Sequence, residues 1–119
     1  AGALPLSPER LRSVAILGPL ADAPREQLGT WVFDGEPAFS VTPLHAVHEL
    51  VGGDMTVRHH PVLAYSRDTA TDAFDEALAL AQQTDATVLF LGEEAILSGE
   101  AHSRADIDLP GMAVSLERE

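Results

Sequence analysis

A polar segment near the end of the sequence gathers side chains that can transfer protons. Residues 92–110 read G-E-E-A-I-L-S-G-E-A-H-S-R-A-D-I-D-L-P, with one histidine and one arginine among five carboxylic acids. A carboxyl group in such a loop can serve as a general acid when burial or a neighbouring carboxylate raises its pKa. Residue type does not choose among these acids, and a solvated surface loop is the alternative interpretation. The five acids are Glu93, Glu94, Glu100, Asp106 and Asp108.

Four histidines form two close pairs that resemble parts of a metal site. His45 and His48 lie three positions apart in a predicted helix, and His59 and His60 are adjacent in a predicted strand. A metal site usually needs three or four converging ligands. Adjacent strand residues point to opposite faces of a sheet, so the second pair does not converge. We therefore expect no metal ion.

The amino-acid composition excludes several kinds of catalysis. The 119 residues include no Cys and no Lys, which excludes disulfides, thiolate nucleophiles, Schiff-base lysines and a Walker A phosphate loop. Ser98 precedes a glycine, but Ile96 stands where a nucleophile elbow needs another glycine. No G-x-G-x-x-G follows Gly18, so dinucleotide binding is not expected. We expect no cofactor.

The charge balance is strongly acidic. Seven basic residues stand against 19 acidic ones, which gives a formal charge of −12. Such a protein repels phosphate groups, so we expect neither nucleic acid nor an anionic membrane as a partner. No run approaches the roughly 18 apolar residues of a membrane helix, and residues 1–12 lack the pattern of a signal peptide. A soluble domain with a solvated, charged surface is expected.

Three short apolar runs predict β-strands. Residues 13–17 read S-V-A-I-L and stop at a glycine and a proline, which is typical of a strand buried on both faces. Residues 55–59 form a second predicted strand. Residues 86–91 read A-T-V-L-F-L and are the clearest of the three.

Two amphipathic helices are predicted between these strands. Thr42 supplies an N-cap oxygen before Pro43, and the first helix ends at Gly52–Gly53. The second helix spans about residues 74–81, with acidic residues in its first turn that suit the helix dipole. Its predicted apolar stripe contains Phe74, Ala77, Leu78 and Ala81.

The alternation of strands and helices predicts an α/β fold, because parallel strands need crossover connections. We expect a parallel sheet in a flavodoxin-like three-layer sandwich, as a single partial domain over residues 1–119. A last helix begins near Gly111 and reaches Glu119 without a stop signal, so the domain looks truncated. Ligands of such folds bind beyond the carboxyl ends of the strands, which here lead into residues 18–22 and 92–110.

The segment between the first strand and the first helix is rich in Gly, Pro and Asp. Residues 20–40 are predicted to be an extended loop with one short helical turn near residues 24–28. Trp31 is the single tryptophan of the chain and lies in this loop. It either packs locally under the loop or contacts another domain, since exposed aromatic residues mark interfaces.

Several motifs together resemble a known family. They are G-P-L-A-D at 18–22, G-T-W at 29–31, S-V-T-P-L at 40–44, G-E at 92–93 and G-E-A-H-S-R-A-D-I-D-L-P at 99–110. These motifs resemble the second domain of glycoside hydrolase family 3, with the closest likeness to the bacterial periplasmic β-glucosidase branch. The resemblance runs from about Leu4 to Glu119, and its last motif is the most specific.

The resemblance implies a retaining exo-glycosidase of two domains. In that family a (β/α)8 barrel carries an aspartate nucleophile, and the α/β sandwich lends a glutamate acid/base on a loop. The family segment H-E-A-S-S-R matches residues 99–104, so the transferred role falls on Glu100, although Gly99 and His102 depart from the pattern. Four further residues are candidates for supporting the loop: Glu93, His102, Ser103 and Arg104.

The resemblance also sets expectations for activity and partners. The chain contains no barrel and no nucleophile, so we expect it to be inactive alone. The implied substrate of the whole enzyme is a β-linked glucoside or short oligosaccharide, and the implied location is periplasmic or secreted. The alternative is a non-catalytic, flavodoxin-like binding or interaction module. A phosphoacceptor receiver is disfavoured, because no acidic residues directly follow the first strand and no lysine is available.

Overall fold

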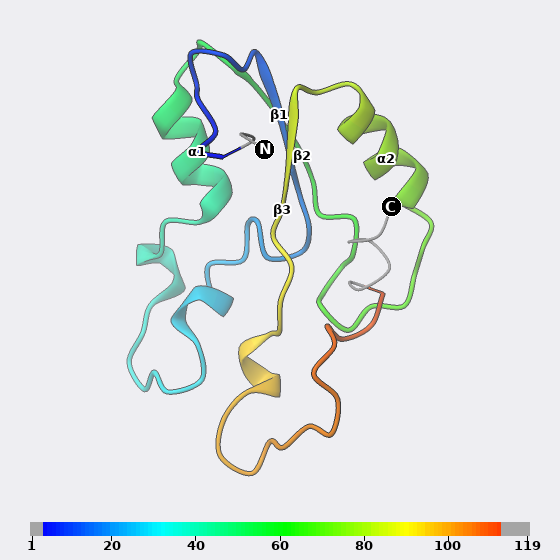
Figure 1. Cartoon of the computed structure of the whole chain (residues 1–119). Helices are drawn as coiled ribbons and strands as arrows, with labels where there is room; N and C mark the ends of the chain where they lie inside the picture. Colours follow the sequence, from blue (N-terminus) through cyan, green and yellow to red (C-terminus); the bar gives the residue numbers. More distant parts are fainter. Residues whose placement is uncertain (1–3, 113–119) are drawn as a thin grey trace.

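Three parallel strands form the centre of the computed structural model, which describes residues 4–112 (Figure 1). β1 (Ser13–Leu17) lies between β2 (Thr56–His60) and β3 (Ala86–Leu89). The three predicted strands and their parallel pairing are therefore confirmed. β2 begins one residue later than predicted and β3 ends two residues earlier, although the Phe90 amide still donates to the Leu17 carbonyl at 2.8 Å.

The central strand is buried on both faces, as its continuous apolar run predicts. Val14 and Ile16 pack on the side of α1 (Pro43–Val51), whereas Ala15 and Leu17 pack on the side of α2 (Phe74–Gln82). Alternation along the strand produces these two faces. The result is the predicted three-layer arrangement, with one helix on each face of the sheet (Figure 1).

Local signals fix both ends of α1. Thr42 is the N-cap residue, and its hydroxyl oxygen accepts a hydrogen bond from the His45 amide at 3.3 Å while donating to Asp22 at 2.8 Å. Pro43 occupies the first helical position, where its missing N–H is not needed. Gly52 ends the helix with a φ of +56°, a conformation that suits glycine. The predicted helix boundaries are confirmed.

The inner stripe of α2 differs from the predicted one. Phe74, Ala77 and Leu80 contact the cluster around β1, whereas Leu78 is 36% exposed. The helical repeat carries Leu78 away from the sheet and turns Leu80 toward it. The spacing correctly predicted a helix with Phe74 and Ala77 on its inner face, but it included Leu78 there and omitted Leu80.

Asp85 joins the amino ends of β1 and β3. Its carboxylate accepts hydrogen bonds from the Arg12 amide at 2.8 Å, the Ser13 amide at 2.9 Å and the Ser13 hydroxyl at 3.1 Å. The Arg12 amide, followed by the Ser13 hydroxyl and amide, holds the pKa of Asp85 below its ordinary value. Ionised Asp85 therefore links the amino end of β3 to the amino end of β1 by hydrogen bonds.

Short 3-10 turns interrupt the long loops. The predicted turn near residues 24–28 is present as η1 (Glu26–Leu28), but η2 (Pro37–Phe39) and η3 (Ala95–Leu97) were not predicted. The helix predicted from Gly111 lies almost entirely outside the described residues. Among those that are described, neither α-helix is long and apolar enough to cross a membrane.

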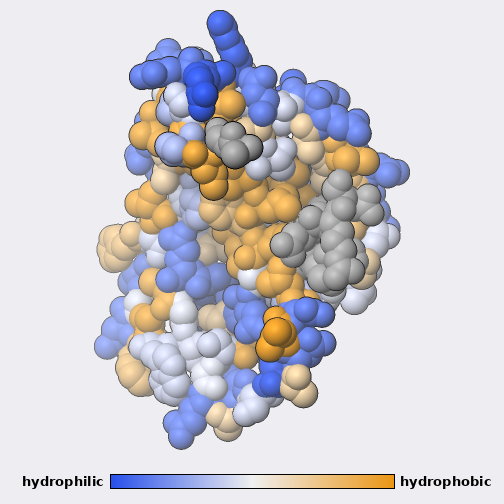
Figure 2. Space-filling view, in the orientation of Figure 1, coloured by the Kyte–Doolittle hydropathy of each residue, from blue (hydrophilic) through white to orange (hydrophobic). Residues whose placement is uncertain are grey.

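On the face shown in Figure 2, apolar side chains gather over the sheet. Figure 2 shows hydrophobic side chains over the strands near the centre of the view, whereas the region below, around the loops, is mostly polar. A groove along the outer edge of β3 is lined by Leu4, Leu6 and Leu11 together with residues 85–89. β3 has one neighbour, β1, in the described sheet.

Candidate acid loop at the carboxyl edge of the sheet

The carboxyl ends of the strands lead into loops that meet below the sheet in Figure 1. Gly18 allows the first of these loops to pass beside β3. Its φ is +108°, and a Cβ atom placed there would lie 2.5 Å from the Phe90 carbonyl oxygen. Only glycine fits such an approach. The Leu20 amide then donates to the same carbonyl at 3.3 Å.

The candidate acid loop, residues 92–110, follows β3. Its first residues, 92–95, are called the root of the loop, and residues 99–102 are called its tip. An ion pair joins the root to the returning part of the loop. Glu93, near the start of the loop, forms an ion pair with Arg104, two residues after the turn at 99–102, so the outgoing and returning parts of the loop lie together. The Arg104 guanidinium also donates to the Asp108 carbonyl oxygen at 2.8 Å. Two of the four residues proposed as loop supports thus contact each other. The sequence alone contained no sign of this pairing beyond their opposite charges.

Glu94 ties the root of the acid loop to the loop that follows β2. One carboxylate oxygen accepts hydrogen bonds from the Ser66 hydroxyl at 2.9 Å and from the Arg67 Nε at 3.1 Å. Ser66 is fully buried, and the Glu94 side chain is 16% exposed. The structure thereby distinguishes Glu94 from the exposed acids of the loop, because a neighbouring cation and hydroxyl already bind its carboxylate.

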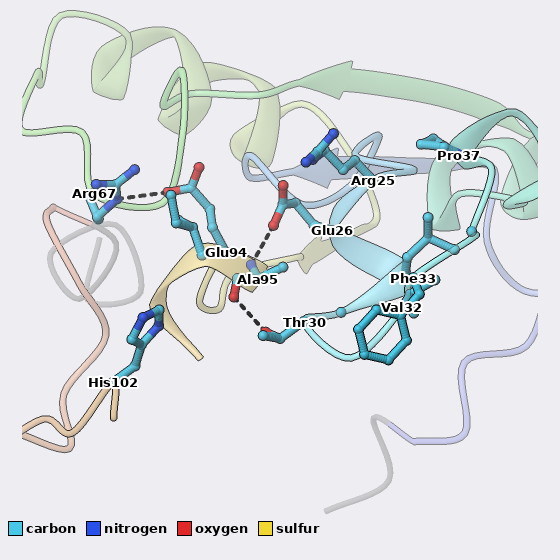
Figure 3. A pocket seen from close by; sticks show the side chains of 14 residues that line it. Arg25, Glu26, Thr30, Val32, Phe33, Pro37, Arg67, Glu94, Ala95 and His102 are labelled. Atoms are coloured by element: carbon cyan, nitrogen blue, oxygen red, sulfur yellow. Dashed lines mark hydrogen bonds and ion pairs between the residues drawn. The ribbon is translucent and has the colours of Figure 1, made fainter. Parts of the chain in front are cut away.

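A second anchor comes from the segment between β1 and α1. The Ala95 amide donates to the Glu26 carboxylate at 2.5 Å. The Thr30 Oγ1 lies 2.6 Å from the Ala95 carbonyl oxygen and 2.9 Å from that of Ser98. Figure 3 shows Glu26 and Thr30 reaching the peptide groups of Ala95, with the Arg67–Glu94 pair to their side. η3 is thus held from both its N–H and its C=O groups.

The tip of the acid loop is a tight turn that carries Glu100. The His102 amide donates to the Gly99 carbonyl at 3.2 Å, which makes Glu100 and Ala101 the two central residues of the turn. Ala101 has a φ of +63°, the conformation that a type II turn requires at this position and that a residue with a side chain adopts at some cost. Glu100 is exposed at the outer end of the acid loop.

The remaining proposed support residues lie at the end of this turn and directly after it. The His102 side chain lines an open cleft of about 720 Å³, whereas Ser103 is exposed. The other walls of the cleft come from residues 25–37, Arg67 and residues 94–96, and Glu100 does not line it. The acid loop therefore has a root packed beside a polar cleft and a tip that projects beyond it.

Trp31 and its neighbours are exposed near the acid loop. Trp31 is 66% exposed and Phe33 is 93% exposed. This exposure argues against local packing under the loop and favours the alternative, a contact with another domain. A Cβ atom on Gly99 would lie 3.9 Å from the Trp31 ring, so the tryptophan edge reaches the start of the tip.

The four histidines do not form a common site. The His59 Nδ1 lies 2.8 Å from the Ile16 carbonyl oxygen, and the His60 Nδ1 accepts from the Val62 amide at 2.8 Å. His45 pairs with Glu49 at 3.3 Å along α1. Within residues 4–112, no three His, Asp or Glu side chains are grouped so as to hold a metal ion.

Comparison with known proteins gives the family. Residues 1–117 match the model of the glycosyl hydrolase family 3 C-terminal domain. The chain belongs to this family. A β-xylosidase/α-L-arabinofuranosidase 2 of Medicago sativa subsp. varia is 32% identical over 119 residues, which is all of this chain and 14% of the relative. A periplasmic β-glucosidase of Salmonella typhimurium is 29% identical over 117 residues, covering 82% of this chain and 15% of the relative.

Solved structures of a β-xylosidase and a β-glucosidase share the fold. A GH3 exo-β-xylosidase, XlnD, in complex with a xylobiose aziridine probe matches with a TM-score of 0.80 and 29% identity, covering 95% of this chain and 14% of that one. A β-glucosidase from Listeria innocua in complex with glucose matches with a TM-score of 0.77 and 29% identity, covering 98% and 15%. The likeness extends over nearly the whole of this chain.

The comparisons confirm the predicted family, but they do not restrict the chain to the predicted branch of that family. The relatives of this family 3 domain include both xylosidases and glucosidases, so the periplasmic β-glucosidase branch is supported only in part. The chain spans about a seventh of the length of these curated relatives.

Sequence reasoning missed the residues that hold the root of the acid loop. They are Glu26, Thr30, Ser66 and Arg67. One weak signal existed, because Thr30 lies inside the G-T-W motif that contributed to the family resemblance. Nothing in the sequence indicated that its partner would be the acid loop.

Proposed function

We propose that this domain supplies the general acid/base of a retaining exo-β-glycosidase, and that Glu100 is that residue. The observation that carries the proposal is the place of Glu100 at the tip of an anchored loop, within the motif that resembles the acid/base segment of the family. Glu93, Glu94 and Asp106 are less suited to the role. The Glu93 and Glu94 carboxylates form ion pairs with Arg104 and Arg67, respectively. The Asp106 carboxylate accepts a hydrogen bond from the Asp108 amide at 3.0 Å.

The proposed mechanism uses two carboxyl groups about 5–5.5 Å apart, as in retaining glycosidases. The aspartate of a barrel domain, which this chain does not contain, attacks the anomeric carbon while the bond to the leaving oxygen breaks. Glu100 gives its proton to that oxygen. In the second step Glu100 takes a proton from water, whose oxygen attacks the anomeric carbon and displaces the aspartate. A projecting, exposed tip suits a carboxyl group that must reach into a pocket formed by other polypeptide.

Two substrate classes have support. The motif resemblance favours a β-linked glucoside, and the names of several relatives favour a β-linked xyloside. In either case the proposed enzyme acts at the ends of short oligosaccharides. Aryl β-glucosides and aryl β-xylosides distinguish the two, since the preferred sugar gives the higher kcat/KM in the full-length enzyme.

The test of the acid/base role is Glu100→Ala in the full-length enzyme, assayed with two leaving groups on the same sugar. Loss of a general acid lowers kcat/KM for a poor leaving group about 10²- to 10⁴-fold and spares an activated dinitrophenyl substrate. Azide then restores turnover on the activated substrate and yields a glycosyl azide of retained configuration.

The matched control is Asp106→Ala, which removes another exposed carboxylate from the same loop. It is expected to leave the ratio between the two leaving groups unchanged. Equal losses on both substrates in Glu100→Ala would contradict the acid/base role and indicate a structural role for Glu100 instead. The 119-residue chain alone is expected to release no product from either glycoside, because it lacks a nucleophile. Hydrolysis by that chain, abolished in Glu100→Gln, would overturn the two-domain mechanism.

A further inference from the structure

Thr30 is the last side chain to hold the acid loop before its tip. Its Oγ1 lies 2.6 Å from the Ala95 carbonyl oxygen and 2.9 Å from the Ser98 carbonyl oxygen. These two carbonyl groups stand at the start of η3 and directly after it. A hydroxyl has one proton to donate, so the two oxygens share it. Thr30 therefore fixes the span of backbone that leads into Gly99 and Glu100.

The methyl group of Thr30 reaches one residue further along the loop. A Cβ atom built on Gly99 would lie only 2.8 Å from the Thr30 Cγ2. The bare backbone of Gly99 thus rests against this methyl group, and the residue after it is Glu100. The Thr30 hydroxyl therefore holds the loop by hydrogen bonds, and its methyl group lies beside the loop backbone at Gly99.

The other anchors of the acid loop act further from the tip. Glu26 holds the Ala95 amide, and Ser66 and Arg67 hold Glu94. Across residues 4–112, the Glu100 carboxylate makes no hydrogen bond or ion pair that could position it directly. The position of Glu100 therefore depends on the backbone of residues 98–99, which Thr30 contacts.

We propose that Thr30 is a positioning residue for the acid/base, acting through the Ser98 and Gly99 backbone. This inference rests on the proposed function of Glu100. The physical basis is the sensitivity of proton transfer to geometry, since a displacement of about 1 Å can reduce the rate about a hundredfold. Thr30 itself touches neither the substrate nor the transferred proton in this mechanism.

The experiment compares Thr30→Val with Thr30→Ser in the full-length enzyme. Valine keeps the shape but removes the donor and places a methyl group against the carbonyl oxygens, whereas serine keeps the hydroxyl. Thr30→Val is expected to lower kcat about ten- to a hundredfold on a poor leaving group, with little change in KM and little effect on a dinitrophenyl substrate. Thr30→Ser is expected to stay within a few-fold of the parent enzyme on both.

A second measurement reports on the loop without any substrate. Hydrogen–deuterium exchange of the amides in residues 95–102 is expected to accelerate in Thr30→Val and to remain unchanged in Thr30→Ser and in Glu100→Ala. Unchanged exchange and unchanged kcat in Thr30→Val would overturn the inference. Equal kinetic losses on the two leaving groups would do so as well, because they indicate a general structural role.

The two proposals fail separately in this design. If Glu100→Ala shows no dependence on the leaving group, the acid/base assignment is wrong, and the Thr30 inference falls with it. If Glu100→Ala shows that dependence and Thr30→Val does not, Glu100 keeps its role and only the positioning role of Thr30 is refuted.

Discussion

Replacing Gly99 with alanine tests how closely the acid loop must approach Thr30. The new Cβ atom would lie 2.8 Å from the Thr30 Cγ2, whereas carbon atoms in ordinary contact are about 3.5–4.0 Å apart. The loop and the Thr30 side chain must therefore separate by about 0.7 Å or more, and a retreat of the loop is the expected response because the Thr30 hydroxyl is held by two carbonyl groups. Gly99 also has a φ of +127°, which residues with a side chain rarely adopt. Both effects displace the residue that precedes Glu100.

The expected kinetic effect follows from this displacement. If about 1 Å corresponds to a hundredfold loss, a shift of about 0.7 Å corresponds to a loss of about ten- to thirtyfold. We expect this loss in kcat on a poor leaving group in the full-length enzyme and a much smaller loss on a dinitrophenyl substrate. Gly53→Ala is the matched control, because a Cβ atom there would meet nothing within 4 Å.

A double variant separates the two physical causes. Thr30→Ser removes the Cγ2 atom, and the next nearest Thr30 atom would lie 3.8 Å from the new Cβ. Combining Thr30→Ser with Gly99→Ala should therefore recover the part of the activity lost through the clash. The part that remains lost reports the backbone strain at φ +127°. Normal activity of Gly99→Ala on the poor leaving group would refute the reasoning, and so would a double variant no better than Gly99→Ala.

Two further predictions concern stability. Ile16→Ala should destabilise the domain by about 2–5 kcal/mol in urea-induced unfolding, because Ile16 is 1% exposed in the core. Ile107 is fully exposed, so Ile107→Ala should change the stability little. Similar urea midpoints for the two variants would contradict this prediction. Ionised Asp85 stabilises the fold because its pKa is lowered, chiefly by the Arg12 amide. This stabilisation is complete above the ordinary pKa of 3.8 and lost as the pH falls through the lower folded-state pKa. The Tm difference between the parent and Asp85→Asn should therefore shrink with acidification, and a constant difference would exclude this linkage.

The elements that sequence analysis predicted well are those whose signals are local. The run from Ser13 to Leu17 predicted its buried strand, and Thr42 with Pro43 predicted the start of α1. Leu78 was wrongly predicted to face the sheet, because helical spacing alone is compatible with two apolar stripes on this helix. The sheet, not the helix, decides between them, by packing Leu80 against β1.

The anchors of the acid loop were not predictable in the same way. Thr30 and Ala95 are 65 residues apart in the chain, and Glu26 and Ala95 are 69 apart. Such pairs meet only after β1 and β3 have paired, so no local pattern encodes them. The candidate acid itself came from a motif resemblance, whereas the network that holds its loop came from the structure alone.

A growing polypeptide makes β1 long before either of its sheet neighbours. Ser13 pairs with Thr56, and Val14 pairs with Ala86. At about 5–20 residues per second, the ribosome takes roughly 3–14 seconds to proceed from Leu17 to Ala86. During that interval the most apolar strand lacks a neighbour on at least one edge, and it is open to chaperones and to other nascent copies. An unpaired β1 on the growing chain is therefore a hazard that the finished sheet, in which both of its edges are paired, no longer presents.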